Sequence, residues 1–101
     1  MELILWMKTG FFKKTPYSLE VKESDLLLIP TKAEDAERII LKQEGLLSVT
    51  LTQQKYPELE IQTQDAVYAG VFEEGVAFEE AANYLREHLN TKIICEYKGG
   101  E

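Results

Sequence analysis

The chain has 101 residues, 45% of them hydrophobic and 29% charged, which is typical of one folded domain (residues 1–101) and argues against disorder. Eighteen acidic against eleven basic residues give a net charge of −7, which argues against a protein that binds nucleic-acid phosphates. One cysteine excludes an internal disulfide, and one histidine beside it argues against a structural zinc site. We therefore expect no metal and no cofactor.

The N-terminal segment does not have the pattern of a secretory signal. Its apolar run, Leu3–Met7, is shorter than the roughly 7–15 residues such a signal needs, and it follows Glu2 instead of basic residues. Nowhere does the chain approach the ~18–20 apolar residues of a membrane-spanning helix. These features and the single cysteine predict a cytoplasmic protein.

The pattern up to about residue 72 is that of short β-strands separated by polar turns. Alternating or continuous apolar residues predict seven strands, at about 3–12, 17–21, 26–29, 38–42, 47–51, 58–63 and 66–72. Strands spaced about 8–12 residues apart are typical of an antiparallel sandwich or barrel. Parallel pairing among them would need helical crossovers, and no helical period precedes residue 75.

The period changes after Gly75. Apolar residues at helical spacing then define a single face, made of Phe78, Ala81, Ala82, Leu85 and Leu89. This pattern predicts an amphipathic helix over about 76–90, with Glu79 and Glu80 near its positive end. The segment that follows, TKIICEY (91–97), is either a short strand or a tail.

Four segments resemble, in order, the pleckstrin-homology (PH) superfold, and in particular its bacterial PH-like and GRAM-like members. They are SLEVKESDLLLIP (18–30), RIILKQEGLLSVTL (38–51), LEIQTQDAVYAGVF (59–72) and the helical face that starts at Phe78. The resemblance implies a mainly β fold with one helix, a PH-like barrel of seven antiparallel strands in two sheets capped by a C-terminal α-helix. It does not by itself transfer a function.

Some members of this superfold bind phosphoinositides through a basic first hairpin loop. Here that loop offers Lys13, Lys14 and Lys22 without an arginine, and the neighbouring loop is acidic, which argues against a specific phosphate site. A peripheral membrane role is the second hypothesis. Its lipid-facing residues are Trp6, Phe11, Phe12, Lys13 and Lys14.

Other relatives of the superfold take up a peptide beside strand five and the C-terminal helix by strand addition. The matching residues here are Leu46, Ser48, Thr50 and Thr52 on the strand and Tyr84 and His88 on the helix. We expect this edge either to be blunted by the helix or to bind a protein partner or another copy of the chain. The acidic surplus lies in residues 56–101, where it serves solubility or steers a basic partner.

No group of residues in the sequence has the pattern of a catalytic site. His88 and Cys95 are the only conventional nucleophile pair, and both fall in segments where a structural role is expected. Carboxylates adjacent in sequence, such as Glu73 and Glu74, point apart on a strand or helix, and no glycine-rich phosphate loop is present. The sequence therefore favours a non-catalytic protein-interaction or scaffolding module, with self-association as one mode of contact, and not an enzyme.

Overall fold

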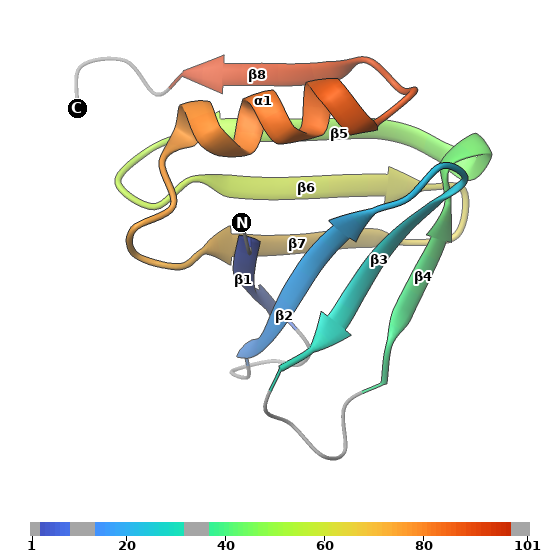
Figure 1. Cartoon of the computed structure of the whole chain (residues 1–101), viewed down its shortest axis with the longest axis horizontal. Helices are drawn as coiled ribbons and strands as arrows, with labels where there is room; N and C mark the ends of the chain where they lie inside the picture. The colour runs from blue at the N-terminus through green and yellow to red at the C-terminus, as the bar shows by residue number, and fades with distance from the viewer. Residues whose placement is uncertain (1–2, 9–13, 32–36, 98–101) are drawn as a thin grey trace.

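A computed structural model describes residues 3–8, 14–31 and 37–97 (Figure 1). Within these ranges the chain forms eight strands, one α-helix and a 3₁₀ turn at Gln43–Gly45. The bounds are β1 Leu3–Lys8, β2 Lys14–Val21, β3 Asp25–Pro30, β4 Ile39–Lys42, β5 Leu46–Gln53, β6 Glu58–Thr63, β7 Val67–Phe72, α1 Phe78–His88 and β8 Ile93–Tyr97. The protein is thus mainly β with one helix near the C-terminus, as predicted.

The strands form one open eight-stranded sheet in the order β4-β3-β2-β1-β7-β6-β5-β8. All neighbouring pairs are antiparallel except β5 and β8, which run parallel. The prediction of seven strands in two sheets was therefore wrong on both counts. The physical reason is that β1 pairs with both β2 and β7, which joins the two halves edge to edge, while the 91–97 segment adds an eighth strand.

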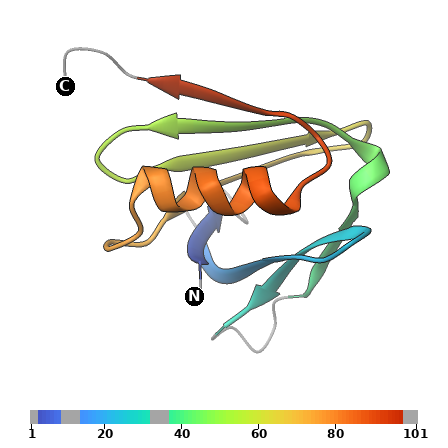
Figure 2. The same cartoon turned by 45° about the horizontal axis from the view of Figure 1, so that its top comes forward.

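The core lies between the sheet and α1, which packs on the concave side of the sheet (Figure 2). The predicted helical face is confirmed, because Phe78, Ala81, Ala82, Leu85 and Leu89 are all buried. Alternate strand residues meet this face, and the largest fully buried ones are Leu3, Leu5, Leu26, Leu28, Val49, Leu51, Leu59, Ile61 and Phe72. The period-two pattern of the strands thus directs one side chain in two into the core.

The helix is shorter than predicted and begins at Phe78, because Ala77 directly before it has an extended backbone, with φ of −79° and ψ of 146°. Gly75, in the turn that precedes Ala77, has φ of +99°, a left-handed conformation that glycine tolerates. Ala77 precedes the helix and has no side-chain oxygen to cap it. Instead its backbone N–H donates to Oε1 of Glu80 at 3.3 Å, so the carboxylate of the first turn satisfies one of the unpaired groups there.

The start of β5 also differs from the prediction. A bulge between Leu46 and Ser48 shifts the register, so Leu46 is buried and Leu47 is 58% exposed. Because Leu47, Val49 and Leu51 alternate with polar residues, the sequence pattern predicts all three on one face of the strand. A bulge inserts an extra residue in one strand and reverses the faces of the residues before it, which apolar alternation alone does not reveal.

Gly70 allows β1 and β7 to meet closely. A Cβ built at this position would lie 2.5 Å from Sδ of Met7 and 3.1 Å from the backbone oxygen of Trp6. Met7 is itself buried, so its side chain has little room to move away. The join between the two halves of the sheet therefore depends on the missing side chain at this position.

Candidate functional site

The predicted partner-binding edge on β5 is covered by another strand. β8 lies along β5 from Val49 opposite Ile93 to Gln53 opposite Tyr97. This edge is thus covered by a strand of the same chain, which is neither of the two predicted alternatives, cover by the helix or an open edge that binds a partner. The open edge on this side of the sheet belongs to β8, and we take β8 as the candidate functional site.

The four β5 residues predicted to face a partner do not form one surface. Leu46 and Thr52 are buried, and Ser48 and Thr50 are half-buried. The Ser48 hydroxyl donates to Oε1 of Gln62 on β6 at 3.4 Å, so this side chain serves the contact between neighbouring strands. The bulge before Ser48 and the presence of β8 together account for the difference from the prediction.

Tyr84 and His88 also have structural partners. The Tyr84 hydroxyl accepts a hydrogen bond from the backbone N–H of Val21 at 3.0 Å, which ties α1 to the end of β2. The His88 ring stacks on Tyr84 with 4.3 Å between ring centroids, and its Nδ1 donates to the Tyr84 carbonyl oxygen at 2.8 Å. A shallow hollow of about 340 Å³ beside them is lined by Tyr84, Asn83 and the acidic Glu80 and Glu87.

β8 lies at the margin of the molecule, and among the described elements it pairs only with β5 (Figure 1). Its side chains alternate: Ile93 and Cys95 are half-buried, whereas Ile94 and Glu96 are exposed, as is Lys92 directly before the strand. Exposure reaches 48% at Ile94. An edge strand leaves every second pair of backbone N–H and C=O groups without a partner in the sheet, so β8 offers both polar and apolar contacts.

Two contacts hold the inner face of β8 to the helix. The Tyr97 ring lies 5.3 Å from the Phe78 ring, centroid to centroid, and Nη2 of Arg86 donates to Sγ of Cys95 at 3.2 Å. These contacts fix the strand to the N-terminal and C-terminal turns of α1. They leave the outer face, with Lys92, Ile94 and Glu96, free of contact with the helix.

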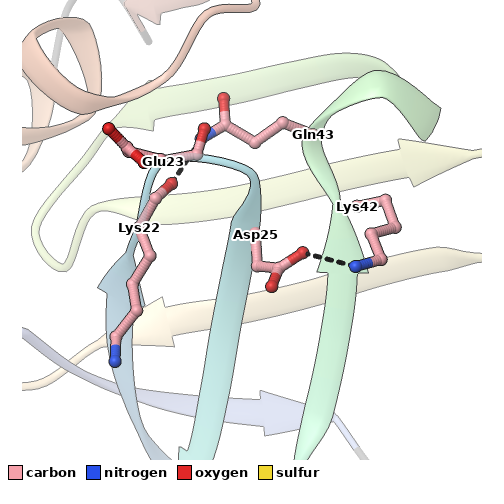
Figure 3. A network of polar contacts seen from close by, with 5 residues as sticks. All are labelled: Lys22, Glu23, Asp25, Lys42 and Gln43. Carbon is pink, nitrogen blue, oxygen red and sulfur yellow. Dashed lines mark hydrogen bonds and ion pairs between the residues drawn. The ribbon is translucent and has the colours of Figure 1, made fainter.

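Gln43 is a buried polar side chain with several hydrogen-bond partners, and the sequence pattern does not predict its role. It is 4% exposed; its Nε2 donates to the carbonyl oxygens of Lys22 at 2.8 Å and Glu23 at 3.3 Å (Figure 3) and lies 3.5 Å from that of His88. Its Oε1 accepts from the backbone N–H of Asn90 at 2.8 Å. One amide thus links the β2–β3 turn to the end of α1, a structural role that a glutamine in a predicted turn gives no signal of.

An ion pair closes the same end of the sheet. Nζ of Lys42 lies 3.2 Å from Oδ1 of Asp25, across the β3–β4 pair (Figure 3). This oxygen is buried and has no partner in hydrogen-bond geometry, so the ammonium compensates its charge through proximity alone. Lys42 also lines a shallow hollow of about 280 Å³, together with Gln43 and Asn90.

The proposed lipid-facing residues are only partly within the described residues. Phe11, Phe12 and Lys13 lie outside them. Trp6 is 38% exposed on β1, and Lys14 is exposed at the start of β2, directly opposite Lys8. The Lys8 ammonium lies 4.0 Å from Oε2 of Glu58, which partly offsets the like charges at this point.

The Cys–His pair weighed in the sequence analysis has separate partners: Arg86 for Cys95 and Tyr84 for His88. Among residues 3–8, 14–31 and 37–97 there is no group of three or more His, Cys, Asp or Glu side chains placed to hold a metal ion. In the same part of the chain, no helix has the length and apolar character needed to cross a membrane. No model of a known protein family matches the sequence, and neither does any curated protein.

Proposed function

We propose that the protein is a non-catalytic interaction module of the cytoplasm that binds an extended segment of a protein partner along the open edge of β8. The observation that carries the proposal is the exposure of this edge, with Ile94 and Tyr97 48% and 61% exposed. Strand addition supplies affinity through backbone hydrogen bonds and specificity through alternate side chains. Both kinds of contact are available on β8.

The two outer strands of the sheet differ in the sign of their charges. β4 has four residues, and the charged residues at its two ends, Arg38 and Lys42, are both basic. β8 has five residues, with Lys92 directly before it and Glu96 within it. Like charges along an edge oppose pairing, whereas charges of both signs can be matched by a paired strand, which favours β8 over β4 as the binding edge.

We also infer that the fold is a variant of the PH-like fold. Seven consecutive antiparallel strands followed directly by one amphipathic helix support this inference. The variant differs in its single sheet and in β8, which occupies the side of β5 where relatives of the superfold take up peptides. In this chain the strand-addition site is then displaced outward by one strand.

A matched pair of substitutions tests the β8 proposal. Peptides that bind the protein are selected from a random extended-peptide library, and their binding is measured for Ile94→Lys and for Leu47→Lys. Both residues are exposed and apolar, but only Ile94 lies on β8. We expect the Ile94 variant to lose at least about tenfold in affinity, because a lysine on an edge strand opposes pairing, and the Leu47 variant to keep it.

The same experiment includes a direct readout of the contact. Amide hydrogen exchange of residues 93–97 should slow when the peptide binds, because strand addition pairs backbone groups that are otherwise open to water. Equal binding by both variants, or protection confined to other strands, refutes the proposal.

Membrane binding is the second candidate, and one observation favours it. Lys8 and Lys14 face each other across β1 and β2 beside the exposed Trp6, an arrangement of like charges that an anionic surface would stabilise. Co-sedimentation with phosphatidylserine vesicles at low and physiological salt tests it. We expect Lys14→Glu and Trp6→Ala each to reduce binding, and no binding at low salt excludes this candidate.

A further inference from the structure

We infer that the partner at the β8 edge is the β8 strand of a second copy of this chain, paired antiparallel about a two-fold axis at Ile94. The inference rests on the proposed function, because it names the occupant of the same edge. Its argument comes from the order of charges along the strand and from the alternation of its two faces.

The faces of β8 restrict the possible registers. Ile93 and Cys95 share the face toward α1, and Lys92, Ile94 and Glu96 share the opposite one. When two copies join into one continuous sheet with both helices on the same side, directly opposed residues lie on the same face. The two-fold axis therefore lies between the two copies of one β8 residue, which oppose each other directly. It cannot lie level with the midpoint between two successive residues of the strand.

Charge selects one of these registers. With the axis at Ile94, Lys92 of each copy lies opposite Glu96 of the other, and the two Ile94 side chains meet between the two charge pairs. Opposite charges and β-branched pairs directly across an antiparallel ladder are both stabilising. With the axis at Cys95, Ile94 would instead face Glu96, and with the axis at Ile93 it would face Lys92.

Lys92 and Glu96 are available for this contact. Both side chains are exposed, and no ion pair among the described residues uses either of them. On the other face the same register sets Ile93 opposite Cys95, two half-buried side chains. Such a contact is isologous and consumes the β8 edge of both copies, so assembly stops at the dimer.

The size and charge of the chain set the conditions of the test. About five residues on each side make a small interface, so we expect a dissociation constant in the micromolar range or weaker. Two copies each carrying a net charge of −7 also repel each other. Physiological salt screens this long-range repulsion more than the close Lys–Glu pairs, so the oligomeric state is measured at about 0.15 M ionic strength.

A charge exchange tests the register. Lys92→Glu and Glu96→Lys each oppose like charges twice in a homodimer, so sedimentation equilibrium should show each variant dissociating at least about tenfold more readily than the parent protein. An equimolar mixture of the two restores opposite charges at both positions and should dimerise as the parent does. Glu87→Lys is the control for Glu96→Lys, because it changes the net charge by the same amount. Glu87 lies on α1 beside Asn83 and Tyr84 and away from β8, so this variant should leave the dimer intact.

A cysteine placed on the axis gives a second readout. Under mild oxidation, Ile94→Cys in a Cys95→Ser background should form a covalent dimer, because the two sulfurs oppose each other directly, whereas the parent with Cys95 should do so much more slowly. A parent protein that stays monomeric up to millimolar concentration overturns the inference, as do single charge variants that dimerise as well as the parent. If such a monomeric parent still binds selected peptides in a way that needs Ile94, self-pairing fails while the proposed function stands.

Discussion

Replacing Gln43 tests whether one buried amide holds the end of α1 to the β2–β3 turn. Gln43→Ala removes two hydrogen bonds of 2.8 Å, to the Lys22 carbonyl and from the Asn90 N–H, and a weaker one to Glu23. Each such bond contributes about 1 kcal/mol net, and each buried group left unpaired costs about 1–3 kcal/mol. We expect a total loss of about 2–4 kcal/mol in the free energy of unfolding.

The assay is urea denaturation followed by circular dichroism, supported by thermal unfolding. For a domain of about 100 residues this loss lowers Tm by roughly 10–25 °C. Gln62→Ala is the control, because Gln62 is exposed and accepts one long bond from Ser48; its effect should stay within about 0.5 kcal/mol.

A charged isostere sharpens the test. Gln43→Glu keeps the shape of the side chain but sets a carboxylate against the Lys22 and Glu23 carbonyl oxygens, which should raise its pKa above the ordinary value of about 4.3. Because the folded-state pKa is raised, the destabilisation grows as the pH rises from the ordinary value of about 4.3 to the raised value, and it stays constant at higher pH. Gln43→Glu should therefore be closer to the parent in stability at pH 4 than at pH 7. A Gln43→Ala variant as stable as the Gln62 control would refute the reasoning.

Three further substitutions probe the sheet and the helix by the same denaturation assay. Gly70→Ala should cost about 1–3 kcal/mol, because the new methyl group meets the buried Met7 and the Trp6 backbone; an unchanged midpoint would show that β1 and β7 can separate without loss. Leu85→Ala should cost about 2–5 kcal/mol, since Leu85 is fully buried at the centre of the helical face. Tyr84→Phe should cost about 1 kcal/mol and speed amide exchange at Val21, whose N–H loses its acceptor; unaltered exchange there would contradict the assigned bond.

Local patterns predicted the elements well because period and turn chemistry are read over a few residues. Tyr17, Leu19 and Val21 alternate in the sequence and are all buried, and the helical face from Phe78 to Leu89 is buried as predicted. Even the uncertain segment 91–97 contains one of its two predicted alternatives, the strand β8.

The pairing of those elements could not be predicted in the same way. Nothing in Leu3–Lys8 indicates that β1 will pair with β7 as well as with β2, since both contacts use the backbone and depend on the whole chain. The candidate site lies on β8 instead of on β5 for the same reason. The sequence predicted β5 as a strand, but the strand that covers its edge is parallel to it and distant in the sequence. Gln43 was missed because its hydrogen-bond acceptors are carbonyl groups of the β2–β3 turn and of the end of α1, which are distant from it in the sequence.

The double role of β1 also sets an order of events during synthesis of the chain. β1 can pair with β2 as soon as that hairpin leaves the ribosome, but its other side waits for β7, whose last residue is Phe72. At translation rates of about 5–20 residues per second, this second side of β1 stays unpaired for roughly 3–13 s. A nascent chain therefore carries a temporary open edge on β1, where chaperone binding or misassembly would act.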